Sequence, residues 1–585
     1  MNPISRKSFL KQSAALSVLP FFGMPNLSRN IHDPAFNEIV KANNEEVKKL
    51  LAGFKNEIVD VRRSLGFDFA NITAAYIEPS SVYHRKDELV LVLNRILTFL
   101  VKNQNPDGTL DLGNLASPPD TAFIFEPICA AAFILKGNTS PVFKETQALL
   151  KTFITQAAEG LRVGGVHTPN HRWVISAALA RAHAVYPNQG YVDRIEQWLS
   201  EVVYMDADGH YLERSMIYAK VVNTSLLAIA RILNKPELFD LVRRNLSMTY
   251  YYMETNGDLV SFDSRRQDQF MQVNNLDYYL DYRYMAIKDQ SGVFSAISTS
   301  IESVAGFNEK VLPELLFYYQ EVPLYKQNLP KLKALDTNFE RFFETTNLVR
   351  IRRGDTTSTI FGGTDQPLVI ASGRSSSPNI FSFRKGEAIL KYLRFSTSFF
   401  STGYFRSQGI KKVGDTYVLS QKIEAPYYQP LPDNLKKADG DYTHSESTDG
   451  RFWNKMDFQN RPQSNVQHLE TQILVKEKEG KHELEFKVDG TKGVYVTIEL
   501  CFKEGGQLLG IKPIDGESNF ALEQSEGTYV YGKDKIKFGP GTFKHNRLRG
   551  IEGEKYTSHF GTLRTEGMHV FLTGITPFSH VLIIE

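Results

Sequence analysis

The chain has few cysteines, almost no net charge and no long apolar run after its first thirty residues. Cys129 and Cys501 are the two cysteines in 585 residues. Neither stands in a CxxC or Cys/His pattern, so we expect no disulfide framework and no thiolate zinc site. Lys and Arg number 68 and Asp and Glu 66, so the chain offers no basic field to a nucleic acid. We therefore expect no nucleic-acid partner and no membrane-spanning segment.

Several sequence motifs of cofactor and metal chemistry are also missing. There is no HExxH, no EF-hand pattern, no Gly-rich phosphate loop, and no GxSxG in a strand-turn-helix setting. His167 and His171 are four residues apart, but Pro169 between them predicts that a helix begins there, so a helical histidine pair for a metal is not expected. We expect no metal and no cofactor, so any chemistry must come from ordinary side chains.

The N-terminus has the pattern of an export signal. A basic segment, 5–11, precedes the apolar segment 14–22, which is too short to span a bilayer. Arg6-Lys7 followed by Phe9-Leu10-Lys11 is similar to a twin-arginine signal with Lys in place of one Arg. We therefore interpret residues 1–30 as a signal peptide and expect the mature chain to be periplasmic or secreted.

The rest of the chain divides into a helical and a β-rich part. Residues 31–340 show helical periodicity, and Asp-Gly and Asn-Gly turns join successive runs of ten to twenty residues. Such hairpins stack either in a ring, as an α/α toroid, or in a line, as a solenoid. Residues 341–585 contain short runs rich in β-branched and aromatic residues, which predict an antiparallel β-sandwich. The predicted fold class is α+β multidomain, with a toroid followed by a sandwich. The helices that we expect cover 122–135, 143–159, 172–185, 191–203, 218–233, 236–253 and 312–320.

Residues 164–173, GGVHTPNHRW, form the most informative stretch. Thr168 is expected to cap a helix and Pro169 to be its first residue. Asn170, His171 and Arg172 then fall in the first turn, where free N–H groups and the helix dipole favour an anion. An ordinary helix start with a satisfied histidine explains the stretch about equally well.

A second stretch, 206–218, lies between two predicted helices and ends at Tyr218. Together the two stretches, an Asn-His pair, an Asp-Gly turn, Glu-Arg-Ser and then a tyrosine, resemble the polysaccharide lyases built from a toroid and a β-sandwich. That group includes heparinase II/III-like and alginate lyases. A narrower possibility is the lyases that remove rhamnose caps from glucuronate on arabinogalactan. Asn114 and the segment 117–121 also fit the loops of the inner cavity in this group.

The resemblance implies an acidic, uronic-acid-containing glycan as partner and β-elimination at O4 as the reaction. Asn170, His171 or Arg172 would compensate the carboxylate while the C5 proton is removed. Tyr218 would act as base, acid or both. Free tyrosine has a pKa of about 10, so a basic role requires a nearby cation, for which Arg214 is one candidate. The expected catalytic residues are Tyr218, His171 and Asn170, and the expected substrate-binding residues are Arg172, Tyr211, Arg214, Arg265, Arg266, His444 and Trp453.

Two other functions stay open at this point. An inverting glycoside hydrolase on the same scaffold would need two carboxyl groups about 6.5–9.5 Å apart, for which Asp120, Glu213 and Asp263 are conceivable. A non-catalytic periplasmic glycan-binding protein would bind without changing its ligand, and its function would survive replacement of Tyr218 by Phe.

Overall fold

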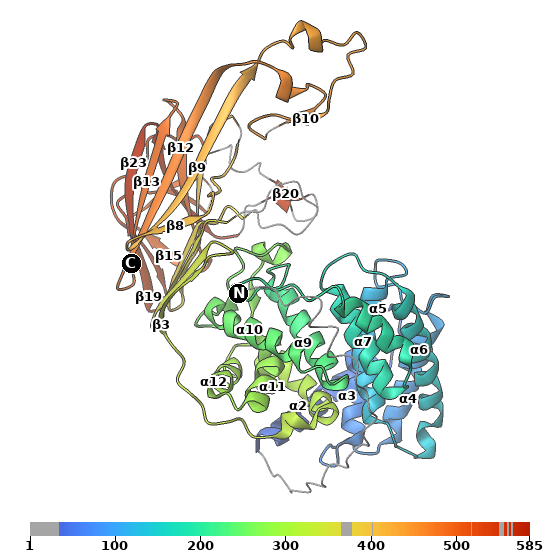
Figure 1. The fold of residues 1–585 in the computed structure, drawn as a ribbon. Coiled ribbons are helices and arrows are strands. Elements are labelled where there is room, and N and C mark those ends of the chain that lie inside the picture. Colours follow the sequence, from blue (N-terminus) through green and yellow to red (C-terminus); the bar gives the residue numbers. More distant parts are fainter. Residues whose placement is uncertain are drawn as a thin grey trace.

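The computed structural model describes residues 34–585 except 364–376, 401, 451, 516–517, 549–554, 558–560 and 563–565. The expected signal peptide, 1–30, lies outside the described residues. The chain forms a helical part followed by a part made of mostly antiparallel sheets (Figure 1). The predicted fold class is therefore confirmed. Among the described residues, no helix is both long and apolar enough to cross a membrane.

The helical part is a ring of hairpins. Its helices are α2 (Pro34–Gly53), α3 (Ser64–Ile77), α4 (Asp87–Lys102), α5 (Pro118–Ile134), α6 (Lys144–Val163), α7 (His171–Val185), α8 (Gln189–Leu199), α9 (Met216–Ile232), α10 (Glu237–Tyr252), α11 (Tyr279–Asp289), α12 (Gly292–Ile301) and α13 (Leu315–Glu321). Helices α3, α5, α7 and α9 pack on one another in succession, and α13 returns to contact α3 and α5. The hairpins therefore form a ring and not an open line.

Burial distinguishes inner helices from outer ones. Helix α4 is amphipathic and buries one stripe, including Leu89, Leu93 and Leu97. By contrast, α5 and α7 are buried over most of their surface and are rich in alanine. Small side chains let these inner helices approach closely, and continuous burial explains their weak amphipathic pattern.

The starts of the three inner helices differ from those expected. Helix α7 begins at His171, while Thr168 and Pro169 lie in the preceding turn. In α9, Ser215 is the N-cap and accepts a hydrogen bond from the backbone N–H of Tyr218 at 3.1 Å. In α5, Ser117 is the N-cap, and the helix begins at Pro118 and not at residue 122. Serine caps satisfy N–H groups that have no partner within the helix.

The β part is a sandwich of two large sheets. One sheet has the order β15 (Gln507–Leu509), β18 (Gly527–Tyr531), β19 (Asp534–Gly539), β23 (Phe578–Ile584), β13 (Lys481–Gly490), β12 (Gln463–Lys478), β9 (Thr416–Tyr428), β8 (Ile410–Val413). The other has the order β16 (Lys512–Asp515), β17 (Asn519–Ala521), β22 (Met568–Ile575), β14 (Tyr495–Phe502), β7 (Ala388–Thr397), β6 (Phe381–Lys385), β5 (Thr356–Phe361), β4 (Leu348–Arg353), β3 (Asn338–Phe343). Alternation in β13 turns Leu484, Phe486 and Val488 into the core between the sheets.

Buried polar contacts join the two parts. Asp208, in the loop before α9, accepts hydrogen bonds from the backbone N–H groups of Thr345 at 2.9 Å and Thr346 at 3.3 Å. The fully buried guanidinium of Arg350 lies 3.0 Å from the carboxylate of Glu254. The Asp208 contacts tie the loop that leads to Tyr218 to the turn between β3 and β4, and the ion pair ties the segment after α10 to β4.

Candidate active site

Residues before and at the N-terminal ends of α7 and α9 meet in one cluster. Asn170 is 1% exposed, and its amide Nδ2 donates to the two carboxylate oxygens of Glu213 at 3.1 and 2.9 Å. Its backbone N–H also donates to Glu213, at 3.2 Å. Glu213 therefore fixes the start of α7 to the loop that precedes α9.

Arg266 extends this cluster to Tyr218. The Nη1 atom of Arg266 forms an ion pair with Glu213, and its Nη2 atom donates to the phenol oxygen of Tyr218 at 3.3 Å. The guanidinium carbon lies 4.2 Å from the centre of the Tyr218 ring. Gln267 donates to the same phenol oxygen at 2.9 Å. Arg266 and Gln267 therefore both donate to this oxygen, and Arg266 also places a positive charge beside it.

His171 lies next to Asn170 and is half-buried. Its ring packs edge-on against those of His167 and Phe123, with centroid distances of 4.8 and 6.5 Å. Burial, the neighbouring His167 and the cation of Arg266 lower the pKa of His171 to about 4, although Asp120 opposes the shift. The imidazole is therefore neutral near pH 7. It can accept a proton, but it supplies no positive charge to a substrate carboxylate.

We expect this pKa to set the acid limb of a pH profile of activity. Because kcat/KM reports groups of the free enzyme, we expect no loss through His171 until the pH falls to about 4. In His167→Ala the pKa of His171 should rise, which moves the acid limb of the profile to higher pH. A pH profile of kcat/KM checks this, and an unmoved limb in His167→Ala contradicts it.

Protonation of His171 also affects folding. Its pKa is lower in the folded chain than the ordinary value of 6.5, so the unfolded chain binds more protons between about pH 4 and 6.5. The contribution of His171 to the free energy of unfolding is therefore complete above pH 6.5 and falls as the pH drops toward 4.

Four of the expected substrate-binding residues lie outside this cluster. Arg172 projects toward the turn that follows α8, where its Nη1 atom is 2.6 Å from a carboxylate oxygen of Glu201. Tyr211 is buried and donates to Asn223 at 2.8 Å. Arg214 turns toward Asp206 and Arg265 donates to the backbone carbonyl of Leu212 at 2.8 Å. Of the two arginines expected to bind a uronate, Arg266 is therefore the one whose side chain joins the cluster.

His444 and Trp453 lie on an arm, residues 429–462, that connects β9 to β12. Figure 1 shows this arm at the far end of the two long strands, clear of the helices. The rings of His444 and Trp453 pack on each other with a centroid distance of 5.6 Å, and Trp453 is 54% exposed. The structure does not bring these two residues to the Asn170–Tyr218 cluster, because the long strands β9 and β12 carry the arm away from the ring.

This position gives a prediction. We expect Trp453→Ala and His444→Ala each to leave kcat/KM on a short soluble substrate within about twofold, because surface substitutions away from a site have small effects. Steady-state kinetics check this. A tenfold loss in either variant would mean that the arm reaches the cluster during turnover.

The carboxylates considered for a hydrolase are all engaged. Asp263 is fully buried and accepts a hydrogen bond from Tyr252 at 3.0 Å. Glu213 is held by Asn170 and Arg266, as described above. Asp120 forms an ion pair with Arg63 and also accepts from Asn114 at 2.7 Å. The structure thus offers no open acid pair from these three residues. Within the part of the chain that is described, no group of three or more His, Cys, Asp or Glu is placed to hold a metal ion.

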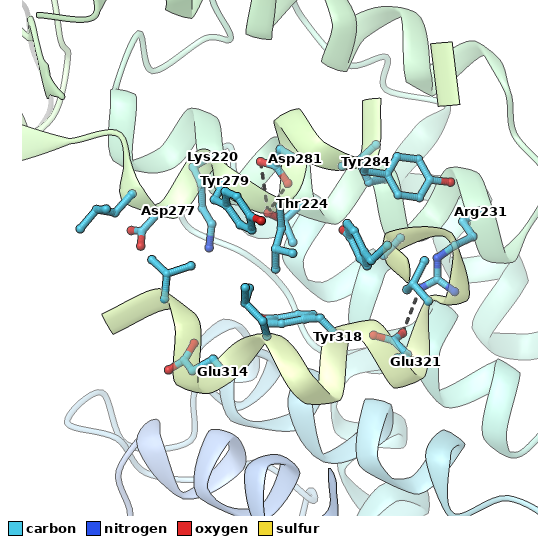
Figure 2. A pocket seen from close by; sticks show the side chains of 18 of the residues that line it. Lys220, Thr224, Arg231, Asp277, Tyr279, Asp281, Tyr284, Glu314, Tyr318 and Glu321 are labelled. Atoms are coloured by element: carbon cyan, nitrogen blue, oxygen red, sulfur yellow. Dashed lines mark hydrogen bonds and ion pairs between the residues drawn. The ribbon is translucent and has the colours of Figure 1, made fainter. Parts of the chain in front are cut away.

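Two cavities, each of about 90 Å³, lie inside the ring. Figure 2 shows the first, which α9, α11 and α13 line with charged and tyrosine side chains, among them Lys220, Asp281 and Tyr318. The second shares Lys220 and Tyr318 with the first, but aromatic and aliphatic side chains dominate its wall. Phe123 belongs to that wall and also packs against His171. Phe123 therefore connects this cavity to His171, which is not itself part of the wall.

Solved structures share this architecture. Heparinase III superposes with a TM-score of 0.54 at 11% identity, covering 99% of this chain and 88% of its own. The chondroitin AC lyase of Streptomyces coelicolor A3 gives 0.52 at 11% identity, covering 96% and 80%. Xanthan lyase from Paenibacillus gives 0.55 at 9% identity, covering 95% of this chain and 57% of its own. The fold is that of polysaccharide lyases. No family model matches the sequence, and neither does any curated protein.

Part of the cluster could not be predicted from the sequence. From the sequence, Glu213 is only a possible hydrolase acid, and nothing in the sequence predicts that Gln267 contacts Tyr218. Arg63 lies in an ordinary basic pair at the start of α3. A hint existed for Glu213, since it lies in the same short stretch as Tyr218. The contacts of Arg63 depend on a residue 57 positions away and have no local pattern.

Proposed function

We propose that this chain is a polysaccharide lyase that cleaves the bond to O4 of a uronic acid by β-elimination. The observation that carries the proposal is the continuous set of contacts from Asn170 through Glu213 and Arg266 to the phenol oxygen of Tyr218. It places a neutral imidazole in the same cluster as a phenol oxygen that accepts from Arg266 and Gln267. The shared fold with lyases that act on acidic glycans supports the same reaction class.

The reaction requires two proton transfers, one from C5 and one to O4. A base removes the C5 proton, the electron pair forms the C4–C5 double bond, and the C4–O4 bond breaks as O4 takes up a proton. Tyr218 suits both transfers, because Arg266 and Gln267 stabilise its oxygen when it carries negative charge. His171 is neutral and offers a second acceptor for the C5 proton.

Within this class we propose exo-acting cleavage of a rhamnose–glucuronate linkage on arabinogalactan, by an enzyme that its N-terminal signal exports. The second cavity, whose wall includes the Phe123 ring that packs against His171, supports a deoxy sugar, since its aromatic and aliphatic side chains can bury a methyl group. Burial of one such carbon is worth about 0.8 kcal/mol. A wholly hydroxylated sugar would gain less from the same wall.

The test is a screen of acidic glycans for new ultraviolet absorbance from the unsaturated uronate. Arabinogalactan that carries rhamnose–glucuronate termini should give the largest signal, alongside polyuronates and unsulfated chondroitin as comparisons. The same digestion in H₂¹⁸O should give products without label, because elimination consumes no water. Labelled, saturated products would indicate a hydrolase, and binding without any product would indicate a glycan-binding protein.

A further inference from the structure

Two arginines flank His171, and each is held in the same way. Arg266 pairs with Glu213 and lies over the ring of Tyr218. On the other side, Arg63 pairs with Asp120 and lies over the ring of Phe123, 4.4 Å from its centre. Phe123 also packs against His171. Both guanidinium groups are therefore preorganised next to one imidazole.

The two arginines differ in the N–H groups that they still have to offer. Nη1 of Arg266 donates to Glu213, and its Nη2 donates to Tyr218. Its Nε atom is buried without an acceptor among the described residues, and its side chain is only 14% exposed, so its remaining N–H groups are poorly accessible to an incoming carboxylate. Arg63 donates through its Nη2 atom to Asp120. Its Nη1 and Nε atoms contact no acceptor in the part of the chain that the structure describes, and its side chain is 54% exposed.

The anchor of Arg63 is itself fixed. Asp120 lies at the start of α5 and accepts hydrogen bonds from Asn114 at 2.7 Å and from the hydroxyl of Ser117 at 2.9 Å. These bonds and that with Arg63 lower the pKa of Asp120 against the effect of its burial. The carboxylate therefore stays charged and holds Arg63 at the edge of the site.

We propose that the two arginines divide the work: Arg63 binds the acid group of the glycan, whereas Arg266 serves the phenol oxygen of Tyr218. The ligand is a carboxylate or sulfate on the sugar that lies against His171. The free Nη1 and Nε atoms of Arg63 form charge-assisted hydrogen bonds with it. This inference rests on the proposed function, because it assumes an acidic glycan in the site.

The experiment measures binding without turnover, in a Tyr218→Phe chain. Arg63→Gln is compared with a matched control, Arg62→Gln, which removes the neighbouring arginine. Arg62 lies 3.5 Å from Asp68 and donates to Ser64 at 2.9 Å. The probes are a glucuronate-bearing arabinogalactan, unsulfated chondroitin, chondroitin sulfate and carboxyl-reduced chondroitin. Calorimetry gives Kd for each, and thermal unfolding reports the fold.

We expect Arg63→Gln to raise Kd about 10- to 100-fold for the carboxylate-bearing probes, as for a lost hydrogen bond to a charged group. Arg62→Gln should change it less than about twofold, and carboxyl-reduced chondroitin should bind the Arg63→Gln chain and its parent equally well. An effect confined to chondroitin sulfate assigns the bound group as sulfate. Melting should shift by no more than about 3 °C, because a half-exposed pair adds little stability.

Equal binding of the acidic probes by Arg63→Gln and its parent would overturn the inference, as would equal losses in the Arg62 and Arg63 variants. Absence of binding by every acidic probe would overturn it too. The proposed function fails separately, when the unaltered chain gives no unsaturated product from any acidic glycan. Loss of product with intact, Arg63-dependent binding would leave a glycan-binding site and no lyase.

Discussion

Replacement of Tyr218 by phenylalanine should lower kcat by about 10²–10⁴-fold, the range for loss of a general acid or base. The ring stays, so its contact with the guanidinium of Arg266 is kept. What disappears is the oxygen that accepts from Arg266 and Gln267 and that exchanges protons with the substrate in the proposed reaction. We therefore expect KM to change by less than about threefold. Initial rates of unsaturated-product formation measure both constants.

A matched control is Tyr211→Phe. Tyr211 lies in the same stretch, but it is buried and its hydroxyl donates to Asn223. Its loss should cost about 1 kcal/mol of the free energy of unfolding and leave kcat within about twofold. Full turnover by Tyr218→Phe would show that another group carries the proton and that the roles assigned to this cluster are mistaken.

Glu213→Gln should have the second largest effect. The glutamine is similar in size, but it carries no charge to balance the mostly buried Arg266, and it has one acceptor oxygen for contacts that now use two. We expect the free energy of unfolding to fall by about 2–4 kcal/mol, near the lower end of the cost of an unpaired buried charge. Because Arg266 and Asn170 lose their common anchor, kcat should fall about 10- to 10³-fold. Denaturant unfolding and steady-state kinetics measure the two effects.

Glu201→Gln provides the comparison for this change. Glu201 pairs with Arg172, but that carboxylate is about half exposed and lies in the turn that follows α8. We expect a loss of less than about 1 kcal/mol, as for other surface ion pairs, and unchanged kcat. Similar losses in the two variants would mean that Glu213 acts through its charge alone and not through its position between Asn170 and Arg266.

Local patterns were sufficient to predict the architecture. The stripe of Leu89, Leu93 and Leu97 marks an outer helix, and the alternation in β13 marks a strand, because both follow from short-range geometry. Local patterns do not distinguish a ring of hairpins from a line. Closure of the ring depends on the contact of α13 with α3, and these helices are more than 200 residues apart in sequence.

The site was harder to predict than the fold. The sequence placed Asn170, His171 and Tyr218 on neighbouring elements, and the structure brings them into one cluster with Arg266. Arg172 follows His171 by one residue, but one helical step turns a side chain by about 100°, and here that step directs Arg172 to the turn that follows α8. Which side of a helix faces the inside of a ring is a property of the whole ring, so neighbouring residues in the motif could not be separated in advance.

The buried pair of Arg350 and Glu254 has a consequence for the way this chain can be taken apart. A cut near residue 340 would leave Glu254 uncompensated on one fragment and Arg350 on the other, and it would strip Asp208 of the two N–H groups that hold its loop. The toroid therefore cannot be fused to a different β-sandwich unless that sandwich also carries the residues that contact the toroid here. A chimera with one of the structurally similar lyases would have to exchange both of these contact surfaces together.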